Sequence, residues 1–280
     1  MQIEYSVLIA VYEKDSPLWF RQALDCMVSQ TLAPMEIVIV EDGKITGELE
    51  HVIAEMQATH PDLFRIVALP ENVGLGAALR KGVEACRYEW IVRMDADDYS
   101  SPRRCELQFE ALEKNKADIV GCDVDEFLDT PPNVIARRVF PITHEDICKF
   151  SKRRTPFAHP AVIMRKSQVL RVGNYRHAYL HEDYDLFIRL LQSGSHCCSV
   201  NLPLVSVRVS PDFYARRGGN KYLKTLLTFN YRQLKDGWMS PVDFLIRSGA
   251  NTVSCLAPNG LREWIYRRML RNDSSSSCCT

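Results

Sequence analysis

The sequence lacks the features of a disulfide-bonded secreted protein and those of a membrane-spanning one. Its ten cysteines include no Cys-x-x-Cys pair and no Cys/His spacing typical of a zinc site. The N-terminal residues run directly into an apolar segment, without the pattern of a signal peptide. No apolar run approaches the length needed to cross a bilayer. We therefore expect a cytoplasmic protein whose cysteines are reduced.

An excess of charge of one sign is also absent, because 35 Lys+Arg balance 35 Asp+Glu. The balance is uneven along the chain: residues 1–200 hold 23 basic and 30 acidic residues, whereas residues 201–280 hold 12 and 5. The basic C-terminal part predicts contact with an anionic partner. Nucleic acid is not expected, since the basic residues lack interleaved stacking aromatics and the whole chain is neutral.

Buried strands and amphipathic helices alternate through the first hundred residues. Near-continuous apolar runs predict strands at 5–12, 37–40, 64–69 and 90–94. Helical patterns lie between them, beginning at Pro17, near residue 48 and after Gly76. This alternation predicts an α/β protein with a Rossmann-like, mostly parallel sheet flanked by helices.

Acidic residues follow several of these strands. Glu13 comes after the first, Asp42 after the second, and Asp95, Asp97 and Asp98 after the fourth. In parallel sheets ligands bind beyond the carboxyl ends of the strands. Carboxylates crowded this closely repel one another unless a cation lies among them, and hard oxygen ligands suit Mg²⁺ or Mn²⁺. A solvated acidic turn is the alternative reading of the Asp95–Asp98 segment.

The second half is less regular. A helix is predicted at 102–114 and a strand at 118–122, followed by a proline-punctuated stretch to Pro160. A second acidic group, 181–185, leads into a helical apolar pattern. The last 60 residues look helical, and residues 273–280 form a low-complexity tail that we expect to be disordered.

A dinucleotide-binding dehydrogenase is a weak alternative, suggested by Gly74 and Gly76 before a helix. Leu79 stands where the third glycine of that motif belongs, and the pair follows the third strand rather than the first. Gly74 and Gly76 then indicate a tight strand-to-helix turn whose amides could lie near a phosphate.

Five motifs, in this order, resemble the family 2 glycosyltransferases. They are Ser-Val-Leu-Ile-Ala-Val-Tyr (6–12), Ile-Val-Glu-Asp-Gly (39–43), Glu-Asn-Val-Gly-Leu-Gly (71–76), Met-Asp-Ala-Asp-Asp (94–98) and Glu-Asp-Tyr-Asp-Leu-Phe-Ile-Arg-Leu (182–190). The likeness covers about residues 4–210 and is greatest to bacterial members that build exopolysaccharide or O-antigen repeat units. It implies the GT-A fold and inversion at the anomeric carbon.

The resemblance implies a donor site for a nucleotide sugar. Asp42 matches the acid that binds the uracil of a UDP-sugar, and Asp95 and Asp97 match the DxD motif. Asp97 would be the direct ligand of Mn²⁺ or Mg²⁺, with Asp95 nearer the ribose or sugar and also a metal candidate. The remaining donor-site candidates are Ala10, Tyr12, Glu13, Gly74 and Ala96. Asp98 is expected to point outward or to cap a helix.

The resemblance also implies an acceptor site. Asp183 matches the catalytic base, and Glu182 beside it would orient or contact the acceptor. His159, His181 and Arg208 are weaker acceptor-site candidates, each with a purely structural alternative. The family often has a metal-binding His where this chain has Ser210, which leaves the third metal ligand open.

The basic C-terminal part contains two further candidates. A helix with Leu261, Trp264, Ile265 and Met269 on one face and Arg262, Arg267, Arg268 and Arg271 mostly opposite would bind an anionic inner-membrane surface or pack on the catalytic body. Arg216, Arg217, Lys221 and Lys224 form a second basic group that could meet an acceptor's diphosphate.

Together these patterns predict a metal-dependent, inverting glycosyltransferase that extends a polyprenyl-diphosphate-linked saccharide with sugar from a UDP-sugar, at the cytoplasmic face of the inner membrane. We expect a catalytic domain at 1–212, with a donor half at about 1–100 and an acceptor half at about 101–212, a helical region at 213–272 and a tail at 273–280. A metal-dependent nucleotidyltransferase and a non-catalytic sugar-nucleotide binding module are the alternatives; the first leaves Glu182 and Asp183 without a task.

Overall fold

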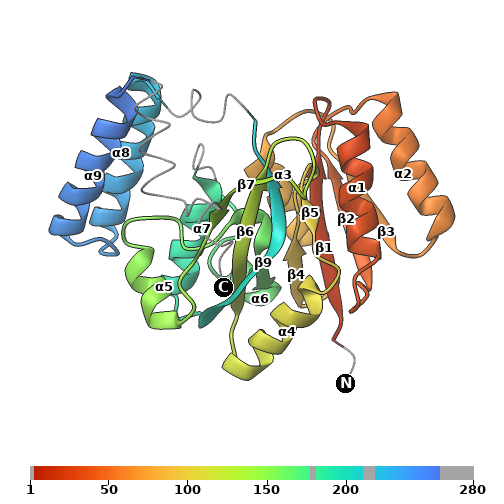
Figure 1. Cartoon of the computed structure of the whole chain (residues 1–280), viewed down its shortest axis with the longest axis horizontal. Helices are drawn as coiled ribbons and strands as arrows, with labels where there is room; N and C mark the ends of the chain where they lie inside the picture. The colour runs from red at the N-terminus through yellow and green to blue at the C-terminus, as the bar shows by residue number, and fades with distance from the viewer. Residues whose placement is uncertain (1–2, 177–180, 211–217, 259–280) are drawn as a thin grey trace.

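The computed structural model describes residues 3–176, 181–210 and 218–258. Within them, a nine-stranded mixed sheet forms the centre of the molecule, with helices on both faces (Figure 1). The strand order is β3-β2-β1-β4-β8-β6-β9-β5, and β7 pairs with β6 outside this path.

The N-terminal half contains the parallel part of the sheet. Its elements are β1 (Tyr5–Val11), α1 (Pro17–Val28), β2 (Glu36–Glu41), α2 (Gly47–Thr59), β3 (Phe64–Ala68), α3 (Leu75–Ala85) and β4 (Trp90–Arg93). β1 pairs in parallel with both β2 and β4, and β2 pairs in parallel with β3. The alternation predicted from apolar periodicity is confirmed.

Side chains alternate between the two faces of this sheet, which explains its uninterrupted apolar strands. Val7 and Ile9 of β1 pack with α1 and α2, whereas Leu8 between them packs with α3 and α7. Gly82 permits close contact of α3, because a Cβ there would lie 2.3 Å from Leu8 Cδ1 and 2.8 Å from Val40 Cγ2. The buried apolar surface on both faces fixes the positions of the strand ends.

The second half adds mostly antiparallel strands and shorter helices. Its elements are β5 (Tyr99–Ser100), α4 (Arg104–Asn115), β6 (Ile119–Phe127), β7 (Val134–Arg138), α5 (His144–Phe150), the 3₁₀ turn η1 (His159–Ala161), β8 (Ile163–Arg165), α6 (Lys166–Arg171), α7 (Glu182–Gln192) and β9 (Cys197–Arg208). β8 pairs antiparallel with β4 and β6, while β9 runs parallel to β6. The strand predicted at 118–122 is longer, the proline-punctuated stretch holds β7 and α5, and β8 follows it.

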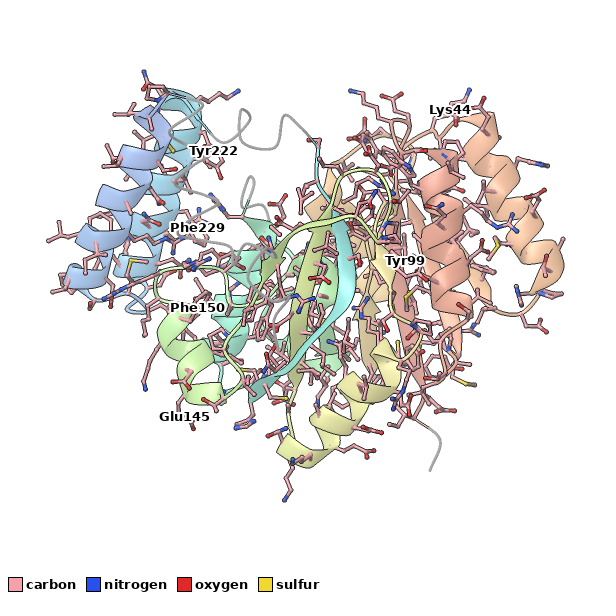
Figure 2. The ribbon with its side chains drawn as sticks, in the orientation of Figure 1. Lys44, Tyr99, Glu145, Phe150, Tyr222 and Phe229 are labelled. Atoms are coloured by element: carbon pink, nitrogen blue, oxygen red, sulfur yellow. The ribbon has the colours of Figure 1, made fainter. Side chains whose placement is uncertain are left out.

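Two C-terminal helices, α8 (Asn220–Lys235) and α9 (Pro241–Leu256), lie side by side at one end of the molecule (Figure 1). Phe229, labelled on α8 in Figure 2, contacts the rings of His181 and Tyr184, at centroid distances of 4.8 and 5.2 Å. Arg247 of α9 donates to the Tyr184 hydroxyl over 2.8 Å. These contacts attach the helical pair to α7. The predicted amphipathic helix at 261–271 lies outside the described residues.

None of the helices in the described ranges is both long and apolar enough to cross a membrane.

Candidate functional site

The site lies where the parallel strands β1, β2 and β4 end. Tyr12, Asp42 and the segment 94–98 follow these strands at a common edge of the sheet, as the sequence predicted. Segments distant in sequence meet there because parallel strands place their carboxyl ends on the same side.

Three carboxylates after β4 form one cluster. Oxygens of Asp95, Asp97 and Asp98 all lie within 4.8 Å of one another. Burial, followed by the charge of Asp95, raises the pKa of Asp97 to about 6. The same two causes raise the pKa of Asp98 well above its ordinary value. Like charges held this closely in a partly dehydrated site favour either protonation or a bound cation.

Asp98 does not point outward or cap a helix, as the sequence had suggested. Its side chain is buried, and its Oδ1 accepts the backbone N–H of Arg208 at 2.8 Å. A residue 110 positions away in sequence therefore fixes it, through the end of β9. The prediction was wrong because adjacent carboxylates favour solvent unless a distant segment covers one of them.

The cluster fits a divalent cation. The second oxygen of Asp98, Oδ2, is buried without a hydrogen-bond partner among the described residues, although it lies beside two further carboxylates. Buried carboxylate oxygens without donors are unfavourable, and a hard cation such as Mn²⁺ or Mg²⁺ would satisfy them. Asp95, Asp97 and Asp98 are the residues that would hold it.

Arg93 is a buried cation beneath this cluster, and the sequence interpretation overlooked it. The side chain is fully buried and its Nη2 forms an ion pair with Asp95. None of its guanidinium nitrogens forms another hydrogen bond among the described residues. The buried positive charge of Arg93 therefore fixes the position of the Asp95 carboxylate. An arginine within the apolar run of β4 is the sequence signal that could have revealed it.

Asp15 is a second residue that the sequence interpretation missed. Its Oδ2 accepts the backbone N–H of Tyr12 over 2.9 Å, which orders the turn after β1. Burial is the main cause that raises its pKa to about 6, and the charges of Asp97 and Asp95 contribute. Asp15 thus extends the acidic cluster toward β1. Ala10 is half-buried in β1, and Glu13 is exposed beside this turn.

Asp42 connects two loops at the predicted donor site. Its carboxylate accepts the backbone N–H groups of Val73 and Gly74, at 2.7 and 3.0 Å. Gly74 has a φ of +86°, which favours glycine. Each Asp42 oxygen retains a lone pair for a further donor. The geometry is compatible with the predicted contact to a base, and that role stays a prediction.

The second acidic group begins α7 and lies against the donor half. A Cβ on Gly76, at the start of α3, would lie 2.8 Å from Glu182 Cγ. Burial mainly raises the pKa of the Tyr175 hydroxyl, and the charges of Asp183, Asp95 and Glu182 raise it further. The charges of both acidic groups therefore act on one buried hydroxyl. Asp183 itself is half-buried.

The two predicted histidines lie near this junction. His159 Nε2 is 2.8 Å from the Tyr175 hydroxyl, and burial, helped by the charge of Arg93, holds the pKa of His159 well below its usual range. His159 is therefore a neutral hydrogen-bonding partner of Tyr175 at physiological pH. His181 is buried against Phe229.

Arg208 braces the acidic cluster. Its Nε donates to the Asp97 carbonyl at 3.1 Å, and Nη1 donates to the carbonyls of Leu128 and Asp129. The guanidinium carbon also lies 4.1 Å from the ring centroid of Trp19. These contacts order the loop that carries Asp97. The predicted contact of Arg208 with an acceptor stays a prediction.

Comparisons with known proteins agree with this geometry. The sequence profile of "Glycosyl transferase family 2" matches residues 6–173. An Escherichia coli protein named UDP-Gal:alpha-D-GlcNAc-diphosphoundecaprenol beta-1,3-galactosyltransferase is 35% identical over 269 residues, covering 96% of this chain and 97% of that protein. The amylovoran biosynthesis glycosyltransferase AmsE of Erwinia amylovora is 32% identical over 269 residues, covering 94% and 98%.

Solved structures share the fold. The mannosyltransferase PcManGT of Pyrobaculum calidifontis, in complex with GDP-Man and Mn²⁺, superposes with a TM-score of 0.66 at 16% identity, covering 90% of this chain and 70% of that one. Residues 1–349 of S. aureus TarS with UDP-GlcNAc give a TM-score of 0.64 at 15% identity, covering 90% and 75%.

The fold and the acidic strand-end cluster thus define a sugar-transferring enzyme of the GT-A type. The chain belongs to glycosyl transferase family 2. The predictions of family, fold and enzyme class are confirmed.

Proposed function

We propose that the protein is a metal-dependent, inverting glycosyltransferase that moves a hexose from a UDP-sugar to a hydroxyl of a polyprenyl-diphosphate-linked saccharide. The observation that carries this proposal is the cluster of Asp95, Asp97 and Asp98 after β4, and the contact between Glu182 at the start of α7 and Gly76 at the start of α3 supports it. The names of the E. coli and Erwinia relatives support the UDP-sugar, the diphosphate-linked acceptor and a place in surface polysaccharide assembly.

The two acidic groups would divide the chemistry. Asp183 would accept the proton of the attacking acceptor hydroxyl, which is a poor nucleophile at neutral pH. Asp95, Asp97 and Asp98 would hold Mn²⁺ or Mg²⁺, which neutralises the charge that develops on the departing UDP. Asp42 would bind the uracil, and Arg93 would keep Asp95 oriented.

A donor and acceptor assay tests the proposal. With Mn²⁺ present, we expect the protein to transfer galactose from UDP-galactose to N-acetylglucosamine linked through diphosphate to an alkyl chain, and to require the metal. Mass spectrometry of the acceptor would detect the added hexose, and NMR would show the inverted anomeric configuration. A retained configuration, or transfer of a nucleotidyl group instead of a sugar, would contradict the proposal.

We also place the enzyme at the cytoplasmic surface of the membrane that carries such an acceptor, and the outer face of α9 supports this. Val242, Leu245, Ile246, Val253 and Leu256 recur at helical spacing and are all exposed, Leu245 to 69%. No charged residue interrupts this stripe, since Asp243 and Arg247 lie on the inner side. α8, beside it, carries four basic residues and no acidic one. An apolar stripe with nearby cations suits an anionic bilayer surface.

Replacing Leu245 and Ile246 with Glu should abolish most binding to vesicles that contain phosphatidylglycerol, because two charges would enter the apolar stripe. Co-sedimentation with the vesicles measures this. Leu18→Glu, at an exposed leucine of α1 on the other side of the molecule, is the matched control and should bind like the wild type. Equal binding by the Leu245/Ile246 variant would place the membrane contact elsewhere.

A further inference from the structure

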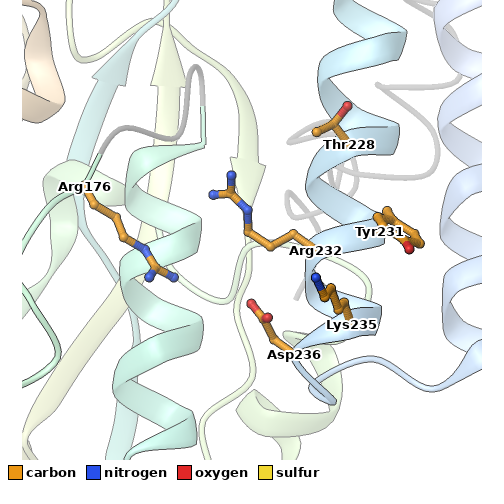
Figure 3. Close-up of a pocket in the computed structure, with 6 residues that line it drawn as sticks. All are labelled: Arg176, Thr228, Tyr231, Arg232, Lys235 and Asp236. Carbon is orange, nitrogen blue, oxygen red and sulfur yellow. The ribbon is translucent and has the colours of Figure 1, made fainter.

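A basic pocket lies between α7 and α8, apart from the acidic clusters. Its volume is about 550 Å³, and it is lined by Arg176, Thr228, Tyr231, Arg232, Lys235 and Asp236 (Figure 3). None of these residues belongs to a motif that was recognisable in the sequence. Figure 3 shows the Arg232 side chain extending from α8 toward α7, with Lys235 and Asp236 below it.

The cationic side chains of this pocket have hydrogen-bond donors that no acceptor among the described residues binds. Neither the Arg232 guanidinium nor the Lys235 ammonium forms a hydrogen bond or ion pair with any residue of the described chain. Arg176 donates from Nε and Nη2 to the two oxygens of Asp185, at 2.8 and 3.1 Å, which fixes its orientation. Among the described residues no acceptor binds its Nη1, so the hydrogens of this nitrogen are available to a ligand.

Charge in and around the pocket favours a dianion. Asp185 is fully buried and shared between Arg176 and Arg189, so two arginines are balanced by one carboxylate. Asp236 offsets one of the two α8 cations that line the pocket, Arg232 and Lys235. A net positive charge of two remains in and around a pocket that is open to solvent. Arginines of fixed orientation are well suited to phosphate oxygens, because they offer several donors in one plane.

The pocket is also close to the proposed base. Asp185, which holds Arg176, lies two residues after Asp183 on α7. Phe229, next to Thr228 of the pocket, contacts His181 immediately before α7. Arg176 also directly follows Tyr175, whose hydroxyl has a pKa raised mainly by burial and further by the charges of Asp183, Asp95 and Glu182. The segment that supplies Arg176 is therefore coupled to the residue that would activate the acceptor hydroxyl. In the proposed complex, a group linked directly to the acceptor sugar would occupy the pocket while the sugar lies at Asp183.

We propose that Arg176, Arg232 and Lys235 bind the diphosphate of the acceptor. This inference rests on the proposed function for the identity of the ligand, but the pocket itself does not depend on the donor site. The basic group predicted from the sequence is a different one: Lys221 and Lys224 of α8 do not line this pocket, and Arg216 and Arg217 lie outside the described residues. Its contact with a diphosphate stays a prediction. The pocket would make the enzyme select acceptors that carry a diphosphate between the sugar and the lipid.

Transfer kinetics provide the first test. Arg232→Gln and Lys235→Gln should each raise the KM for N-acetylglucosaminyl diphosphoryl alkane about 10-fold or more, the size expected for a lost charge-assisted hydrogen bond. Their kcat and the KM for UDP-galactose should stay close to the wild type. Asp236→Asn should lower the acceptor KM, since Asp236 is the one negative side chain among the described residues that line the pocket. Lys114→Gln on α4, with the same charge change far from the pocket, should have no effect.

Direct binding tests the pocket even if no transfer is observed. An alkyl diphosphate without sugar should bind the metal-free protein in calorimetry, and Arg232→Gln should weaken this binding about 10-fold or more. Binding to phosphatidylglycerol vesicles tests the other possible ligand of the pocket, a lipid headgroup. One outcome would overturn the proposal: Arg232→Gln and Lys235→Gln lose vesicle binding but keep the wild-type affinity for the alkyl diphosphate and the wild-type acceptor KM. The pocket would then bind lipid headgroups rather than the acceptor's diphosphate. Failure of transfer with intact diphosphate binding would refute the proposed function alone.

Discussion

Replacing Asp183 with Asn is expected to reduce sugar transfer about 10²-fold to 10⁴-fold, the range typical for loss of a general base. Asparagine has nearly the same size as aspartate but cannot accept a proton at neutral pH. The loss should appear in kcat, because the acceptor hydroxyl would still bind but would not be activated. Steady-state transfer from UDP-galactose to a diphosphate-linked N-acetylglucosamine measures both constants.

The position of Asp183 predicts a separation between transfer and donor binding. Asp183 lies in the first turn of α7, whereas the metal candidates follow β4. Metal-dependent binding of UDP should therefore be unchanged in Asp183→Asn, or slightly tighter, since one negative charge near the diphosphate is removed. Calorimetric titration with UDP and Mn²⁺ provides this comparison.

Glu182→Gln is the matched control, since it neutralises the neighbouring carboxylate. The Glu182 side chain faces Gly76 of α3, which indicates a role in positioning rather than in proton transfer. We expect a smaller loss for Glu182→Gln than for Asp183→Asn. If Asp183→Asn retained transfer within about 10-fold of the wild type, a loss below the range for a general base, the assignment of the base would be wrong.

Local sequence patterns predicted the parallel half of the sheet because its strands are covered on both faces. An uninterrupted apolar run such as that of β1 is a signal that needs no information from distant residues. β5 and β8 have no such signal, with two and three residues respectively. They are strands because β9 and β4 lie beside them, which depends on the tertiary fold.

The same distinction applies to the site. The positions of Asp42, Asp95 and Asp97 at the strand ends were predictable because these residues follow recognisable strands, while their roles at the site stay predictions. The burial of Asp98 was not, since it depends on the backbone of Arg208. The basic pocket was equally hidden, because Arg176 and Arg232 come from separate segments and converge only when α8 packs beside α7. The spacing of these residues in the sequence does not predict such contacts.

Replacing Asp97 with Asn is expected to weaken Mn²⁺-dependent binding of UDP by about 100-fold or more, the upper end of what substitutions next to a metal ligand cost. An amide is a poorer ligand for a hard cation than a carboxylate, and one negative charge is lost. Titration of UDP with and without Mn²⁺ measures the effect. Asp62→Asn, at an exposed acid between α2 and β3, is the control and should bind normally. Unchanged Mn²⁺-dependent binding in Asp97→Asn would remove Asp97 from the metal site.

The same substitution should stabilise the metal-free protein, which distinguishes loss of a ligand from general damage. Burial and the charge of Asp95 raise the pKa of Asp97 to about 6 in the folded protein. A carboxyl with a higher pKa when folded than when unfolded destabilises the fold once it is ionised. Near pH 7 with a chelator, Asp97→Asn should therefore raise the free energy of unfolding by about 2 kcal/mol, at roughly 1.4 kcal/mol per pKa unit with some loss to solvent screening. As the pH falls from about 6 toward about 4, Asp97 becomes protonated in the folded wild type and the difference should disappear. Urea unfolding at several pH values measures this difference. A variant that is less stable than the wild type near pH 7 would show that repulsion among the carboxylates of the cluster does not destabilise the folded protein.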